Sequence, residues 1–207
     1  MNALHVSDMD LLDELHDISI EKLISNFHML ENKSDNHVPL NIMAYAIKRK
    51  LAINDKKVAL KWLQSDYCGL MNKKLEVNNI YRYLTTAKAY IIIGEPDTAI
   101  SLLEKLLVLC YDNKRLIEAV DALILLSIAY RKKKLIKESE DTLIKALGIA
   151  QENDFKQPFI DESVELASQL GRLYHRLLQH YMNERLDVSF VKCLYITTKS
   201  LRDNWKF

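Results

Sequence analysis

Residues 85–107 read TTAKAYIIIGEPDTAISLLEKLL, and residues 125–147 read LLSIAYRKKKLIKESEDTLIKAL. Aligned at an offset of 40 positions, the two segments carry identical residues at Ala89, Tyr90, Leu103, Lys105 and Leu107 of the first and at Ala129, Tyr130, Leu143, Lys145 and Leu147 of the second. A further step of 40 positions towards the N-terminus places Ala99 on Ala59 and Leu103 on Leu63, within KKVALKWLQ. Self-similarity at a fixed period predicts a stack of repeated units.

The clearest unit consists of two predicted helices, 75–93 and 96–112, joined by a short turn. Gly94 ends the first helix, and Pro96 lies in the first turn of the second. This order is expected, because glycine tolerates the backbone of a helix end and proline that of a helix start. The unit is therefore a helical hairpin.

The sizes of the residues in this unit agree with a hairpin. Ala87 and Ala99 are small enough for two helices to cross closely, and Tyr83, Tyr90 and Leu103 fill the space between successive hairpins. The spacing is typical of a tetratricopeptide (TPR) hairpin that is longer than the usual ~34 residues. One packed bundle of similar helices is the alternative, but three aligned units with matching turns favour the repeat.

Helical periodicity of apolar residues covers most of the chain, and no segment alternates with a period of two along its full length. The predicted helices are 8–17, 19–32, 40–53, 55–66, 75–93, 96–112, 115–133, 136–153, 159–182 and 186–203. We predict an all-α, TPR-like superhelix of antiparallel helical hairpins, with about ten helices. One repeat domain spans 1–207, with an N-terminal helical pair at 1–38, clear TPR-like hairpins at 39–158 and atypical capping helices at 159–207.

The composition excludes several classes of protein. Hydrophobic residues make up 49% of the chain, too many for a disordered protein, and only 4 Gly and 3 Pro argue against a turn-rich β sandwich. A formal net charge of +1 is not the strong basic footprint of a nucleic-acid-binding protein. No apolar run is long enough for a membrane span, the first residues lack a secretory signal, and the three cysteines form no CxxC pair. We therefore expect a cytoplasmic protein without membrane contact.

Four segments follow one another between residues 56 and 170: KKVALKWL, YRYLTTAKAYIIIGEPDTAISLLEKLL, RLIEAVDALILLSIAY and LIKALGIAQENDFKQPFIDES. Their ordered succession resembles the C-terminal helical-repeat region of MalT-like, LuxR-family transcriptional activators. In that family a nucleotide-binding module precedes the repeats and a helix-turn-helix follows them. The most distinctive part of the resemblance is the run from Ala146 to Glu162.

The chain also departs from this family. It contains no GxxxxGK[ST] sequence to hold phosphates, and beyond Gly171 it shows no helix-turn-helix with a basic recognition helix. We therefore expect either a sensor-and-coupling region excised from a larger regulator or a stand-alone relative that carries only the repeats.

No motif points to catalysis. The six histidines contain no HExxH pattern, the three cysteines show no catalytic pairing, and the carboxylates are spread over helix faces. We predict that this chain is not an enzyme and carries no catalytic residue, no metal site and no cofactor.

The resemblance to TPR stacks also predicts a binding surface, because the first helix of each hairpin lines the concave face of such stacks. The inward residues are Tyr81, Leu84, Lys88, Asp121, Ile124, Ile128 and Arg131. This mixture of side chains can hold a small ligand or a peptide, or it can pack against a neighbouring domain. We expect Lys88→Ala to leave stability nearly intact while it weakens ligand binding.

The resemblance implies a non-catalytic regulatory and ligand-sensing domain. It would bind a small-molecule inducer or a protein or peptide partner on its concave face and couple that binding to ATPase and DNA-binding modules that this chain lacks. DNA would be contacted only through the missing helix-turn-helix domain. The alternative is a stand-alone TPR-like adaptor that mediates protein–protein interaction.

Overall fold

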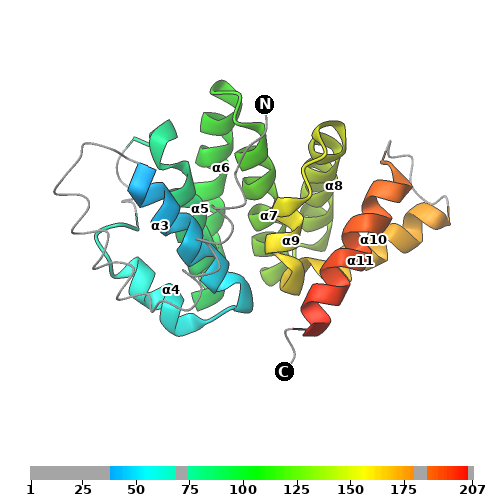
Figure 1. Ribbon diagram of the computed structural model, residues 1–207, viewed down its shortest axis with the longest axis horizontal. Coiled ribbons are helices and arrows are strands. Elements are labelled where there is room, and N and C mark those ends of the chain that lie inside the picture. The colour runs from blue at the N-terminus through cyan, green and yellow to red at the C-terminus, as the bar shows by residue number, and fades with distance from the viewer. Residues whose placement is uncertain (1–37, 69–73, 180–185, 205–207) are drawn as a thin grey trace.

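The computed structural model describes residues 38–68, 74–179 and 186–204 (Figure 1). Within these ranges the secondary structure is helical and no strand occurs. The α-helices are α3 (Val38–Lys50), α4 (Lys56–Leu63), α5 (Ile80–Ile93), α6 (Pro96–Asp112), α7 (Leu116–Lys132), α8 (Ile136–Asn153), α9 (Gln157–Asp161), α10 (Ser163–Leu178) and α11 (Val188–Asn204). The helices predicted at 8–17 and 19–32 lie outside the described residues.

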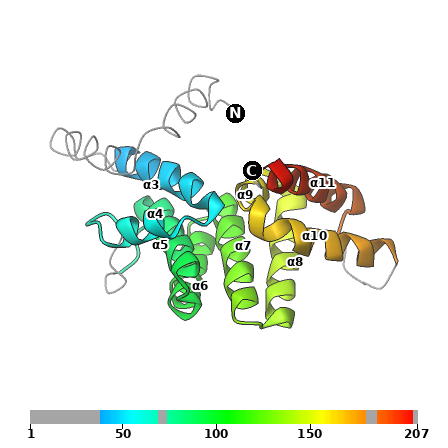
Figure 2. The ribbon, with the colours of Figure 1, turned by 90° about the horizontal axis from the view of Figure 1, so that it is seen from below.

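The helices pack in consecutive pairs. α5 packs on α6, α7 on α8, and α10 on α11, while α6 also contacts α7 and joins the first two pairs into one row. α3 and α4 both pack against α5, and the short α9 packs against α7 and α11. Figure 2 shows α3 and α9 on the same side of the row that α5 to α8 form. The prediction of an all-α helical-repeat fold is confirmed.

The turns of this row recur at a fixed interval. Backbone φ is positive at residues that lie 20 positions apart, Gly94, Lys114, Lys134 and Asp154. After each of these residues, the next backbone N–H donates to the carbonyl five residues earlier, as Arg115 does to Cys110 at 2.8 Å. This hydrogen bond is typical of a Schellman turn, which ends a helix and satisfies one of its last carbonyl groups. Each 40-residue repeat thus consists of two 20-residue helix–turn units.

Small residues lie between the two helices of each hairpin. Ala87 of α5 and Ala99 of α6 are completely buried. The residues 40 positions later, Ser127 of α7 and Ser139 of α8, are also buried. Each serine hydroxyl donates to the backbone carbonyl of the other serine, at 2.7 and 2.8 Å. Both hairpins therefore have small side chains where their two helices cross. The two buried serine hydroxyls satisfy their hydrogen-bonding capacity by bonding to each other's backbone between α7 and α8.

One predicted helix is interrupted in the structure. The segment predicted as a single helix over 159–182 forms α9, which ends at Asp161, and α10, which begins at Ser163. Glu162 between them has non-helical backbone angles, φ −110° and ψ 22°, and its buried side chain accepts a hydrogen bond from Lys88. A contact between residues far apart in sequence accompanies this break, and helical periodicity does not reveal such a contact.

Candidate functional site

The predicted concave residues lie beneath other parts of the same chain. Leu84, Lys88, Asp121, Ile124 and Ile128 are buried, and Tyr81 and Arg131 are partly buried. The cover is α3 over α5 and α9 over α7. Lys88 and Asp121 contact residues of the covering segments, whereas Leu84, Ile124 and Ile128 belong to the hydrophobic core. Ligand binding by this surface stays a prediction.

Two buried ion pairs connect the covering segments, α3 and α9 with the residue that follows it, to the row of helices α5 to α8. The Lys48 ammonium of α3 lies 2.5 Å from the Asp121 carboxylate of α7. The Lys88 ammonium of α5 lies 2.8 Å from the Glu162 carboxylate between α9 and α10. Lys48 is 1% exposed and Lys88 is 3% exposed. The expectation that Lys88→Ala leaves stability intact is therefore reversed, because this change would leave the Glu162 carboxylate buried without its cation.

The two pairs form one electrostatic network. Burial disfavours the charged form of Lys48, but the carboxylates of Asp121 and Glu162 outweigh burial and raise the pKa of Lys48 above its ordinary value. Burial also raises the pKa of Asp121 and of Glu162, while Lys48 and Lys88 oppose that rise. Each charge thus depends on the others for its compensation in the interior.

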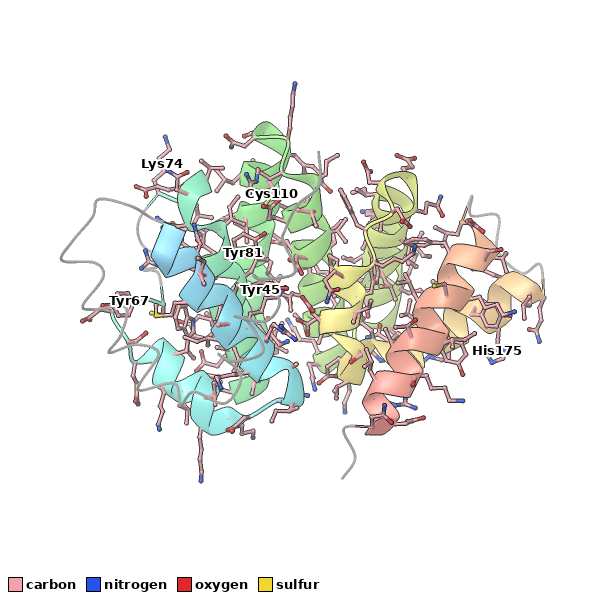
Figure 3. The ribbon with its side chains drawn as sticks, in the orientation of Figure 1. Tyr45, Tyr67, Lys74, Tyr81, Cys110 and His175 are labelled. Carbon is pink, nitrogen blue, oxygen red and sulfur yellow. The ribbon has the colours of Figure 1, made fainter. Side chains whose placement is uncertain are left out.

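Two tyrosine rings lie between α3 and α5 beside this network. Tyr45 and Tyr81 meet edge to face, with their ring centroids 5.9 Å apart (Figure 3). Burial and nearby carboxylates raise the pKa of both phenols to about 12. The hydroxyl of Thr85 on α5 adds a hydrogen bond of 2.8 Å to the carbonyl of Ala44 on α3. α3 is therefore held by an ion pair, an aromatic contact and a hydrogen bond.

Sequence reasoning found half of the network. Lys88 and Asp121 are in the predicted set, because the repeat alignment places both at inward positions of their helices. Their partners Lys48 and Glu162 are absent from that set, because they lie 73 and 74 positions away along the chain. The isolated charge is the signal that was available, since a charged residue in an apolar segment usually requires a buried partner.

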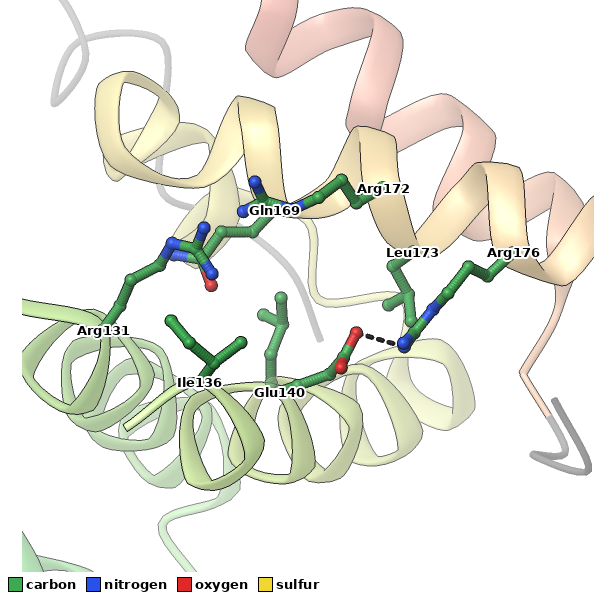
Figure 4. Close-up of a pocket in the computed structure, with 8 residues that line it drawn as sticks. Arg131, Ile136, Glu140, Gln169, Arg172, Leu173 and Arg176 are labelled. Atoms are coloured by element: carbon green, nitrogen blue, oxygen red, sulfur yellow. Dashed lines mark hydrogen bonds and ion pairs between the residues drawn. The ribbon is translucent and has the colours of Figure 1, made fainter. Parts of the chain in front are cut away.

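A separate cleft of about 180 Å³ lies between α8 and α10 (Figure 4). Its apolar lining is Ile136 and Leu143 of α8 and Leu173 of α10. Gln169 of α10 also lines the cleft, and its side-chain oxygen lies 3.2 Å from the Ser139 hydroxyl oxygen of α8. The cleft thus has an apolar part and a polar side chain that the neighbouring helix holds in place.

Charged side chains complete the lining of this cleft, Arg131 at the end of α7, Glu140 of α8, and Arg172 and Arg176 of α10. Arg176 forms an ion pair with Glu140. Burial and the positive charge of Arg131 lower the pKa of Arg172. Arg131 belongs to the predicted set, whereas Arg172 and Arg176 do not. Their spacing of four residues, which places both on one helix face, is the signal that could have found them.

The part of the chain that the structure describes gives little support for a metal site or a nucleophilic cysteine. No group of three or more His, Cys, Asp or Glu side chains there has a metal-binding arrangement. Cys110 is completely buried, and burial raises the pKa of its thiol to about 12 (Figure 3). A buried thiol that holds its proton is a core side chain rather than a nucleophile. None of the described helices is long and apolar enough to cross a membrane.

Comparison with known proteins agrees with this architecture. The family model for the MalT-like TPR region matches residues 21–176, which is most of the chain. No curated protein and no solved structure matches the chain. The matched range contains the whole row from α5 to α8, the covering segments α3 and α9, and both buried ion pairs. The chain therefore belongs to the MalT-like TPR region family.

Proposed function

We propose that this chain is the regulatory repeat region of a transcriptional regulator of the MalT-like, LuxR-family type. Binding of an effector to the repeats would change how α3 and α9 pack against α5 and α7, and attached ATPase and DNA-binding modules would respond to that change. Family membership supports the class of protein. The observation that carries the mechanism is the pair of buried ion pairs, Lys48–Asp121 and Lys88–Glu162.

A regulatory domain requires two arrangements of similar free energy and a ligand that favours one of them. Buried ion pairs suit this requirement, because the cost of removing charges from water offsets most of their attraction. When α3 or α9 moves away, Lys48 or Glu162 regains its hydration, so the electrostatic cost of opening is small. In the open arrangement, the predicted concave residues such as Leu84 and Ile124 become accessible to a small-molecule inducer or a peptide.

The test removes one ion pair without leaving a buried charge. In the source cells, Lys88→Met and Glu162→Leu are introduced together, and transcripts are compared with those of the wild type. We expect the levels of a limited set of transcripts to change, because Met and Leu, unlike the ion pair, gain no hydration when α9 moves, so the variant favours the closed packing. Lys105→Met removes a lysine that is exposed on α6, and it serves as the control that leaves transcripts unchanged. An unchanged transcript profile at equal protein level would overturn the proposal.

A stand-alone adaptor is the second candidate function. Exposed apolar side chains lie on both sides of the α6–α7 turn, at Val108, Tyr111, Leu116 and Ile117. Such side chains are a feature of protein–protein contact surfaces. If the chain is an adaptor, a protein partner that co-purifies with the wild type should be lost from the Tyr111→Ser variant. The transcript profile of cells with this variant should stay the same as that of the wild type. Those two readouts separate the adaptor from the regulator.

A further inference from the structure

Three arginine side chains converge on the cleft between α8 and α10. Figure 4 shows Arg131 and Arg172 extending toward each other, while Arg176 reaches across to Glu140. Within residues 38–68, 74–179 and 186–204, the guanidinium groups of Arg131 and Arg172 form no hydrogen bond and no ion pair with another side chain. The cleft therefore holds three positive charges and one negative charge, and the negative charge is already committed to Arg176.

Two neighbouring cations are unfavourable unless anions compensate them fully. Like charges repel more strongly where protein surrounds them than in open water, and the pKa of Arg172 is lowered because its partial burial and the charges of Arg131 and Arg176 outweigh the opposing charge of Glu140. Arg172 is nevertheless exposed and Arg131 is half-buried, so an anion from solution can reach both. A bound anion would remove the repulsion and gain charge-assisted hydrogen bonds.

We infer that this cleft is a binding site for a small phosphate monoester. The excess of two positive charges matches the charge of about −1.5 to −2 that a phosphate monoester carries at neutral pH. Arginine suits this group, because its planar guanidinium donates two parallel hydrogen bonds to phosphate oxygens. Ile136, Leu143 and Leu173 would contact the carbon part of the ester. A cleft of about 180 Å³ has room for one small molecule of this kind.

The position of the cleft connects it to the buried network. Arg131 lies on α7, in the last hairpin of the row, and Arg172 lies on α10, which follows directly after Glu162. An anion held between the two arginines would draw α10 toward α7 and thereby act on the segment that carries Glu162. This inference names an effector class for the regulatory domain, and in that respect it rests on the proposed function.

The test measures binding by the purified chain with isothermal titration calorimetry. The probes are glycerol 3-phosphate and inorganic phosphate, and glycerol is the uncharged comparison. We expect both phosphates to bind, glycerol 3-phosphate more tightly because its carbon chain meets the apolar lining, and glycerol not to bind. Arg131→Gln and Arg172→Gln should each weaken binding about tenfold, as expected for the loss of a charge-assisted hydrogen bond.

Lys105→Gln on α6 is the matched control, because it removes the same charge from an exposed site outside the cleft. It should leave binding within about twofold, since salt screens charges beyond roughly 10 Å. Thermal unfolding followed by circular dichroism verifies that all three variants are folded. Absence of phosphate binding by the wild type, or equal binding by the cleft variants and the control, would overturn the assignment. Tighter binding of a glutamate-rich peptide than of either phosphate would do so as well, in favour of a protein partner.

The two proposals fail in different ways. If phosphate binds in the cleft but the Lys88 and Glu162 double variant leaves transcripts unchanged, the binding site stands and the regulatory function falls. If the double variant alters transcripts but no phosphate binds, the regulatory function stands and the cleft has another role. A third measurement links the phosphate site to the regulatory function. If the cleft is regulatory, Arg172→Gln should alter the same transcripts in cells as the Lys88 and Glu162 double variant.

Discussion

At the scale of single residues, the molecule depends on charges that have no access to solvent. Lys88 and Glu162 are both almost completely buried, so neither can be compensated by water if the other is removed. Removing one partner of a buried pair typically costs about 3–5 kcal/mol, whereas replacing both with apolar residues is often nearly neutral. The same side chains are therefore sensitive to single substitution and tolerant of paired substitution.

This difference gives a prediction for unfolding in urea. Lys88→Met should lower the free energy of unfolding by about 3–5 kcal/mol, and the double variant Lys88→Met with Glu162→Leu should return to within about 1 kcal/mol of the wild type. Lys105→Met is the exposed control and should change stability by less than about 0.5 kcal/mol. Equal stability of the single variant and the control would show that the ion pair does not form in solution.

At the scale of elements, the four regularly spaced turns contain one glycine. Lys114, Lys134 and Asp154 adopt the left-handed conformation that Gly94 adopts, with φ between 55° and 65°. This conformation costs a residue with a Cβ atom about 1–2 kcal/mol, because the Cβ approaches the neighbouring carbonyl oxygen. Glycine avoids this clash, although it loses more entropy on folding.

Substitutions at these turns should change stability in opposite directions. Lys114→Gly and Lys134→Gly should each raise the free energy of unfolding by up to about 1 kcal/mol, and Gly94→Ala should lower it by about 1 kcal/mol. Lys105→Gly, in the middle of α6, is the matched control and should destabilise, since glycine weakens helix interiors. Chemical unfolding measures all four variants. Destabilisation by glycine at position 114 to the same extent as at 105 would contradict the turn geometry.

The same turns explain how much of the fold the sequence predicts. The helices predicted at 96–112 and 136–153 match α6 and α8 closely, because the turn residues and the apolar period both mark where these helices end. The break at Glu162 was not predicted, because it accompanies a contact with Lys88, 74 positions away. Periodicity shows which face of a helix is apolar, but it does not show what covers that face. For this reason the prediction of a binding surface on α5 and α7 did not include the burial of five of its seven residues.

At the scale of the whole molecule, the ion pairs connect units that are not neighbours in the stack. In most repeat proteins each unit contacts only the next one, so unfolding can proceed unit by unit. Lys48–Asp121 connects α3 to α7, and Lys88–Glu162 connects α5 to the segment after α9. Contacts that pass over a hairpin require the units to unfold together.

Cooperativity is therefore the prediction at this scale. Trp62 is buried in α4, which packs against α5 at the start of the row, and Trp205→Phe makes it the single tryptophan of the chain. In that background, Trp62 fluorescence and helical circular dichroism should report the same urea midpoint. Adding Lys48→Met and Asp121→Leu together should separate the two midpoints, because the α3–α7 connection is lost. Coincident midpoints in this variant would show that apolar packing alone couples the units.

The two ion pairs also restrict the number of hairpins that the stack can contain. One more 40-residue hairpin between residues 88 and 121, a range that lies inside both ion pairs, would preserve every turn, since the added segment begins and ends at equivalent positions. It would also move the later helices by about 10 Å, the usual distance between packed helices. Lys88 would then lie far beyond the 2.8 Å that now joins it to Glu162. The turns and the apolar pattern of the repeats would allow any number of hairpins. The two buried ion pairs form only with the present number of hairpins between their partners, so they restrict this part of the chain to one length.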